Sequence, residues 1–175
     1  MRKIGLLALC LSLIVAFTAA CSNGSKKQSS SDTSAKSGQK ADAKSELMSF
    51  YMNLVDKINA QDSDLNAYES AIGQDPAPTG QALKDLQTKA ETSASNVVPA
   101  LKDVTVPASL SAYKSDLETT IKDLQDGYQM KADELKKAKP SLDAANAKLA
   151  AADAALGNAF QKAGLQKASI VTGVS

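Results

Sequence analysis

Histidine and tryptophan are absent from this chain of 175 residues, and arginine occurs only once, as Arg2. Histidine is the side chain most often used for proton transfer near neutral pH and the commonest metal ligand, so its absence argues against acid–base catalysis and against a metal centre. The single arginine lies in an N-terminal segment that we expect to be removed, so the mature chain lacks the bidentate guanidinium group that recognises phosphates and carboxylates. The sequence therefore predicts a protein that is not an enzyme and that carries no metal or cofactor.

An excess of charge of one sign is also lacking, because 20 lysines and arginines stand against 19 acidic residues and the formal net charge is +1. Nucleic-acid binding needs a clustered basic surface, which so balanced a chain does not offer. The apolar share of 43% and the length are ordinary for one globular domain. We expect a single folded domain that does not bind nucleic acid.

The N-terminus has the pattern of an export signal. A short basic start at residues 1–3 precedes an apolar run at residues 4–17. This run is too short for a comfortable membrane span of about 20 residues, but its length is typical of the core of a signal peptide. We expect residues 1–20 to direct export and then to be removed.

Three small residues, Thr18, Ala19 and Ala20, come directly before Cys21. This stretch resembles the lipobox of bacterial lipoproteins, although Thr18 stands where the family usually has leucine. The resemblance implies that residues 18–20 are recognised by a signal peptidase and that Cys21 receives a diacylglyceryl group. Two acyl chains give stable attachment, so we expect an anchor on the extracytoplasmic face of the cell membrane. The alternative is an ordinary secretory signal, or an uncleaved anchor, with an incidental cysteine.

Cysteine is scarce, and its placement agrees with this interpretation. Cys10 lies inside the apolar run and would leave with the signal, which makes Cys21 the sole cysteine of the mature chain. No disulfide can then form within that chain, although export leads to an oxidising compartment.

Residues 21–41 are predicted to form a disordered tether. The segment 22–40 is rich in serine and lysine and has no aliphatic residue larger than alanine. Such a segment cannot bury enough apolar surface to offset the entropy of ordering. Its lysines give it a net charge of +3, which favours either attraction to anionic lipid or wall polymer, or a simple solvated spacer. From Ala41 onward, 14 lysines against 18 acidic residues leave a net charge of −4.

Apolar residues at helical spacing predict four helices, at about residues 42–72, 81–104, 108–137 and 142–163. The first has a heptad pattern with one polar layer at Gln61. Pro99 predicts a kink near Ser95 in the second, or a break into two shorter helices. Prolines and glycines separate the four segments.

Four amphipathic segments with short connections favour an all-α domain over residues 42–175. Its expected architecture is an antiparallel up-down four-helix bundle with coiled-coil-like heptad seams. Gly164 is a suitable C-cap for the last helix. The tail at residues 165–175 is apolar enough to fold back on the end of the bundle.

Candidate binding groups are few. Asp62, Asp64 and Asn66 have the spacing of the first three ligands in a calcium-binding EF-hand loop. However, Ala67 and Gly73 occupy the positions where that loop requires glycine and glutamate. Neighbouring carboxylates such as Asp133 and Glu134 point about 100° apart on a helix and do not converge on one substrate.

Four tyrosines are the remaining candidates for binding. Tyr51, Tyr68, Tyr113 and Tyr128 lie on or near the expected seams. They are interpreted either as core residues with the hydroxyl reaching water or as the lining of a groove for a peptide or sugar polymer.

The signal region resembles that of Gram-positive lipoproteins. The helical body loosely resembles small uncharacterised lipoproteins, some of them described as cell-wall-binding, but no discrete motif carries this likeness and it transfers no residues. The leading hypothesis is a non-catalytic, lipid-anchored helical module that binds a cell-envelope protein or wall polymer. The alternatives are a carrier of a small apolar ligand beside Ala145, Ala152 and Ala159, and a structural spacer or self-associating coiled coil. The oligomeric state is left open.

Overall fold

The computed structural model describes the backbone of residues 33–174 and the side chains of residues 42–174. The signal segment 1–20, Cys21 and the first part of the tether lie outside the described residues. Within residues 33–174 the chain forms five α-helices and one 3-10 helix, with no strand. The expected all-α class is therefore confirmed for this part of the chain.

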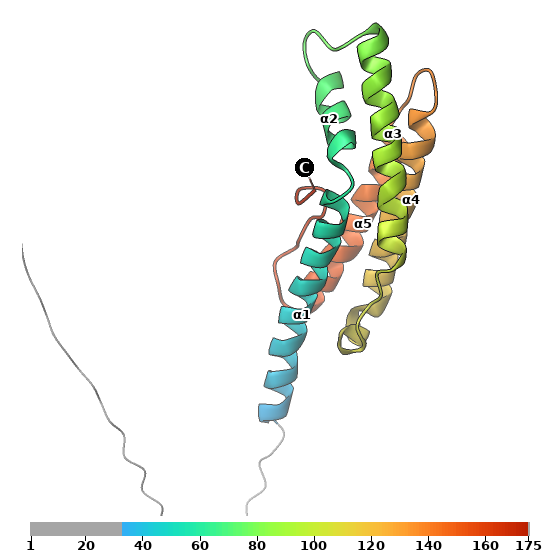
Figure 1. The fold of residues 1–175 in the computed structure, drawn as a ribbon. Helices are drawn as coiled ribbons and strands as arrows, with labels where there is room; N and C mark the ends of the chain where they lie inside the picture. Colours follow the sequence, from blue (N-terminus) through green and yellow to red (C-terminus); the bar gives the residue numbers. More distant parts are fainter. Residues whose placement is uncertain (1–32, 175) are drawn as a thin grey trace, which may run out of the picture. The chain divides into compact units, whose positions relative to one another are not determined.

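The helices occur in the order α1 (Thr33–Asn59), α2 (Ser63–Ile72), α3 (Gly80–Lys102), the 3-10 helix η1 (Ala108–Tyr113), α4 (Lys114–Leu135) and α5 (Asp143–Lys162). In Figure 1, α2 continues upward from the end of α1, and α3 returns beside both of them. Helix α4 packs against α3, and α5 packs against α4. The domain is therefore a set of helices with one shared core.

Helix α1 begins earlier than expected. Its first residue is Thr33, whereas the sequence analysis placed the start near residue 42 and assigned residues 33–41 to the tether. Five of residues 33–41 are alanine, lysine or glutamine, which are good helix formers. Adding residues to an existing helix costs no new nucleation, so the helix extends through them.

The expectation of one continuous helix over residues 42–72 is wrong. The chain breaks at residues 60–62, between α1 and α2, at the polar position that was interpreted as a layer in the seam. The Ser93 hydroxyl on α3 donates to the Gln61 carbonyl at 2.6 Å and accepts from the Leu65 amide at 3.2 Å. Ser93 thus forms hydrogen bonds with two backbone groups that have no partner within a helix because of the break.

Helix α3, in contrast, is not broken at Pro99. It runs as one element from Gly80 to Lys102 with the proline inside it, so the alternative of two shorter helices is wrong. Val97 and Leu101, which flank Pro99, are fully buried. Their packing stabilises the helix across the site where proline removes one backbone donor.

The third expected helix differs at its start. Residues 108–113 form the 3-10 helix η1, and the α-helix begins only at Lys114. Such 3-10 turns are common at the N-terminal end of an α-helix.

Helices α4 and α5 approach each other closely. A Cβ added at Gly127 on α4 would lie 2.6 Å from Leu149 Cδ2 on α5, so only glycine fits there without a shift. The three alanines that were considered as a ligand site, Ala145, Ala152 and Ala159, are fully buried, and none of them lines a described cavity. Small side chains here serve close packing of two helices.

The tail folds back, as expected, and it does so along the side of α1. Gly164 has a φ of +72°, and the Leu165 amide donates to the Phe160 carbonyl at 2.9 Å, a pattern that ends helices. Farther on, the Tyr51 hydroxyl donates to the Ser169 carbonyl at 3.1 Å. Ile170 is fully buried and joins the core.

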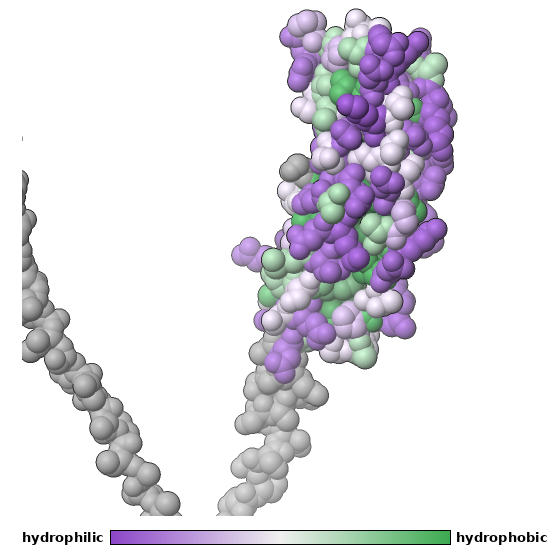
Figure 2. All heavy atoms as spheres, viewed as in Figure 1, coloured by the Kyte–Doolittle hydropathy of each residue, from purple (hydrophilic) through white to green (hydrophobic). Residues whose placement is uncertain are grey.

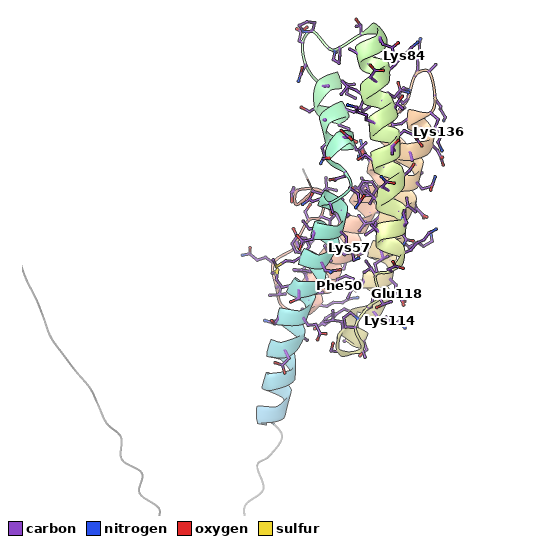
Figure 3. The ribbon with its side chains drawn as sticks, viewed as in Figure 1. Phe50, Lys57, Lys84, Lys114, Glu118 and Lys136 are labelled. Atoms are coloured by element: carbon purple, nitrogen blue, oxygen red, sulfur yellow. The ribbon has the colours of Figure 1, made fainter. Side chains whose placement is uncertain are left out.

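Polar side chains cover most of the face seen in Figure 2, with hydrophobic residues showing as patches between them. Charged residues labelled in Figure 3 lie along the whole length of the helices, from Lys84 and Lys136 at one end to Lys114 and Glu118 at the other.

Two large apolar side chains on α1 are exposed, Met48 at 41% and Met52 at 56%. Among the described residues, no helix has the length and apolar character needed to cross a bilayer.

Replacing Ser93 with alanine is expected to lower the free energy of unfolding by about 1–3 kcal/mol, because the buried Leu65 amide and the partly buried Gln61 carbonyl lose their partner. Chemical denaturation followed by circular dichroism would measure the change. Ser95→Ala is the matched control, since the Ser95 hydroxyl contacts only Glu91 on its own helix, and we expect it to stay within about 0.5 kcal/mol. Equal effects of the two changes would contradict the role given to Ser93.

Candidate functional site

A groove runs between α2 and α5, with α4 as its floor; we call it the α2–α5 groove. Its larger part has a volume of about 780 Å³. Side chains of α2, α4, α5 and the C-terminal tail line it: Asn66, Glu69, Ser70, Tyr128, Lys131, Asn146, Leu149, Ala150, Asp153, Ser169, Val171, Thr172 and Val174. Four segments that are distant in the sequence therefore meet around one hollow.

The groove continues toward the loop between α4 and α5. A second hollow of about 440 Å³ shares Glu69 and Asn146 with the first. It is lined by Tyr68, Glu69, Ile72, Pro140, Ser141, Leu142, Asp143 and Asn146. Because the two hollows share residues from both walls, they adjoin, and the name α2–α5 groove covers both.

An ion pair crosses the floor of the groove. Lys131 on α4 is only 5% exposed, and its Nζ lies 2.5 Å from Glu69 Oε1 on α2. The Glu69 side chain is 32% exposed, so one end of the pair faces the groove. A buried ammonium is costly without a counter-ion, which makes Glu69 the group that allows Lys131 to lie there. The pair also joins α2 to α4.

Behind this pair lies a buried carboxyl group. Asp62, at the break between α1 and α2, is 1% exposed, and the Tyr128 hydroxyl donates to its Oδ2 at 3.4 Å. Burial raises the pKa of Asp62 above its usual range, against the hydrogen bonds from Asn66 and Tyr128 that lower it. Burial also raises the pKa of Tyr128, and the nearby Asp62 and Glu69 carboxylates raise it further. Tyr128 therefore remains a protonated donor at neutral pH.

The tail forms the lower wall of the groove, and Asp153 on α5 holds it there. One Asp153 oxygen accepts from the Ile170 amide at 2.7 Å and from the Val171 amide at 3.3 Å. The other accepts from the Ser169 hydroxyl at 2.5 Å. Hydrogen bonds to a charged group are stronger than those between neutral groups, so this carboxylate fixes the position of Val171 and Thr172 in the wall.

The four tyrosines that were candidates for binding lie in different parts of the structure. Tyr68 and Tyr128 both line the groove, yet they are only 4% and 2% exposed. Tyr51 lies on α1, where its ring packs edge-on against Phe160. Tyr113 lies at the end of η1, half-buried against the core. The tyrosines therefore do not form one surface.

Thr18, Ala19, Ala20 and Cys21 lie outside the described residues. Among the described side chains, no group of three or more Cys, Asp or Glu residues is arranged to hold a metal ion. Of the three residues with calcium-loop spacing, Asp62 is buried and hydrogen-bonded to Tyr128, whereas Asp64 is exposed.

The neighbouring carboxylates on α4 have separate partners. The Lys136 ammonium donates to Asp133 at 3.0 Å, and hydrogen bonds from Lys136 and Gln129 lower the pKa of Asp133. The Glu134 carboxylate accepts from Lys137 and from the Ser141 amide, and these bonds lower the pKa of Glu134. The two carboxylates act in separate surface contacts.

Sequence reasoning missed the polar residues that make the groove, namely Glu69, Lys131, Asn146 and Asp153. One signal was available for Lys131. It lies three residues after Tyr128 and seven after Leu124, which places it on the buried stripe of its helix. A lysine on such a stripe indicates a buried partner.

No protein-family model matches this chain, and no curated protein or solved structure matches it either. The interpretation of the groove therefore comes from its own geometry and chemistry.

The buried Asp62 carboxyl should make stability depend on pH. Because its pKa is raised on folding, the native chain holds this proton more tightly than the unfolded chain. The resulting stabilisation is fully present below the unfolded pKa and is lost as the pH rises through the folded pKa. An Asp62→Asn variant should therefore gain stability relative to the original chain as the pH rises from 3.5 to 7, a trend measurable by urea unfolding.

Asp64→Asn is the matched control, because Asp64 is exposed two residues away. We expect the gain in stability with rising pH to be larger for Asp62→Asn than for Asp64→Asn. If Asp62→Asn followed the original chain at every pH, Asp62 would not be a buried titrating group.

Proposed function

We propose that this chain is a lipid-anchored, extracytoplasmic module that binds a protein or wall partner without catalysing a reaction. The proposal joins two observations from different parts of the chain. The first is the lipobox-like stretch that ends in Cys21, which supports attachment through a diacylglyceryl group. The second is the α2–α5 groove, which supports a binding role for the helical domain.

The groove is the observation that carries the binding role. Its walls combine apolar side chains such as Leu149 and Val171 with a small number of polar groups such as Asn66 and Asn146. This combination is typical of ligand sites. We propose that the helices around the groove form an antiparallel up-down four-helix bundle with heptad seams. In this bundle α1 and α2 together count as one of the four helices.

The alternative of an apolar-ligand carrier receives less support. That function needs a cavity beside Ala145, Ala152 and Ala159, and these alanines are fully buried and line none of the hollows described above. The α2–α5 groove is open to solvent and has charged residues in its floor and wall. Such a site suits a polar partner better than a small apolar molecule.

The anchor is tested by replacing each cysteine in turn in the cells that make the protein. The original chain should incorporate an alkyne analogue of palmitate, and Cys21→Ala should lose essentially all of this label because the acylated residue is gone. Cys10→Ala is the matched control and should keep the label, because Cys10 lies in the segment expected to be removed. An unlabelled original chain, or a labelled Cys21→Ala chain, would overturn the anchor.

The binding role is tested by in-cell photocrosslinking with a reactive residue at Asn146, which lines the groove on α5. Asn158 on the same helix is exposed and lies outside the groove, so a probe there is the control. We expect a severalfold stronger adduct from position 146 than from position 158, read by mass spectrometry. Equal yields at the two positions would contradict a binding role for the groove.

A further inference from the structure

We propose that the occupant of the α2–α5 groove is an extended peptide segment that carries a basic side chain. This inference rests on the proposed binding function and specifies its ligand. Three features of the groove carry it: its length, its polar groups on opposite walls, and its charge.

The groove has the length of a short extended chain. Its α5 wall includes both Asp143 and Asp153, which lie about 15 Å apart along the helix at ~1.5 Å per residue. An extended peptide advances ~3.3 Å per residue, so about five residues fit alongside this wall. The two hollows of about 780 and 440 Å³ follow one another along this direction because they share Glu69 and Asn146.

Two primary amides line the groove from its two sides. Asn66 belongs to α2 and Asn146 to α5, and both line the larger hollow. A primary amide presents a donor and an acceptor in one plane, which matches the N–H and C=O groups of a peptide backbone. Side-chain amides can therefore bind an extended main chain whatever its sequence. Asn66 already donates one amide hydrogen to Asp62, so its carbonyl oxygen and its second amide hydrogen are the groups left for a ligand. Asn146 is better placed because it is exposed and lines both hollows.

The charge of the groove favours a basic peptide. Three carboxylates line it, those of Glu69, Asp143 and Asp153, and one ammonium, that of Lys131. Lys131 is neutralised by Glu69 at 2.5 Å, so the net field comes from Asp143 at one end and Asp153 at the other. Complementary charge raises both the specificity and the rate of association.

A peptide fits the groove better than a sugar polymer does. The aromatic residues that line it are Tyr68 and Tyr128, which are 4% and 2% exposed. Their rings are part of the core and offer no exposed aromatic face for a sugar ring. The apolar side chains Ile72 and Val171, which are exposed, and Leu142, which is half-buried, instead offer contacts for aliphatic side chains of a peptide.

The test uses the full chain in nanodiscs of zwitterionic lipid and fluorescein-labelled heptapeptides, with binding measured by fluorescence anisotropy. The basic peptide has the sequence Ala-Val-Lys-Ser-Val-Lys-Ala, and its matched forms carry glutamine or glutamate at both lysine positions. A labelled tetrasaccharide of N-acetylglucosamine is the sugar probe, and empty nanodiscs give the background. We expect the basic peptide to bind roughly threefold to tenfold more tightly than the neutral peptide, with the acidic peptide weakest.

Two variants locate the binding in the groove. Asn146→Ala should weaken binding of all three peptides by roughly threefold to tenfold, the loss of one hydrogen-bonding group, whereas Asn158→Ala should leave it unchanged. Asp143→Asn should reduce the difference in affinity between the basic and the neutral peptide. It should leave the affinity for the neutral peptide unchanged. Asn146, Asn158 and Asp143 are all exposed, so none of the three changes removes a core contact.

The proposal is overturned if no peptide binds, if only the tetrasaccharide binds, or if Asn146→Ala binds the peptides as well as the original chain does. These outcomes differ from a failure of the proposed function. A chain that gives a groove crosslink to wall polymer in cells but binds no peptide would keep its function as a binding module and lose only the peptide as its ligand.

Discussion

The break between α1 and α2, from which the arrangement of the other helices follows, has its backbone paired by one hydroxyl group. Ser93 accepts the amide of Leu65 and donates to the carbonyl of Gln61, and it does so at the point where α1 ends and α2 begins. A break in a buried helix exposes polar backbone groups to an apolar core, which is unfavourable unless another group pairs with them. Ser93 supplies that group from α3. The chain can therefore interrupt its first helix inside the core and still keep the hydrogen bonds that burial requires.

The break in turn makes room for the polar floor of the groove. It places Asp62 next to Tyr128 and brings Glu69 on α2 to Lys131 on α4. The ion pair joins these two helices, while α5 is held to α4 by small residues and by the pairs Lys148–Asp123 and Lys162–Asp116. Helices α2 and α5 are thus each attached to α4, and the α2–α5 groove is the space left between them.

Much of the helical content could be predicted from the sequence, because apolar spacing reports which stripe of a helix is buried. Leu47, Leu54, Ile58 and Leu65 recur at helical spacing in the first expected segment, and all four are buried. The break could not be predicted in the same way, since Gln61 has the appearance of a polar layer in a continuous helix. The break is stabilised by a serine that lies 32 residues from Gln61 in the sequence. The periodicity of a single sequence contains no information about such a partner.

The groove was still harder to predict. Glu69, Asn146 and Asp153 each have the ordinary appearance of solvated helix residues, and only the packing of distant segments brings them around one hollow. The tyrosines were a reasonable choice of candidates, and two of them do line the groove. Their rings are buried, however, because a large apolar ring gains more from the core than from a wet surface.

The tail has a practical consequence for anyone who handles this protein. Val171, Thr172 and Val174 belong to the wall of the groove, so a purification tag or fluorescent protein fused after the last residue would start beside the site itself. Such a fusion competes for the same space as a ligand and pulls on the hydrogen bonds that Asp153 makes. An internal label at residues 108–109, which are exposed at the start of η1 and do not line the groove, leaves the C-terminal segment as the fold places it.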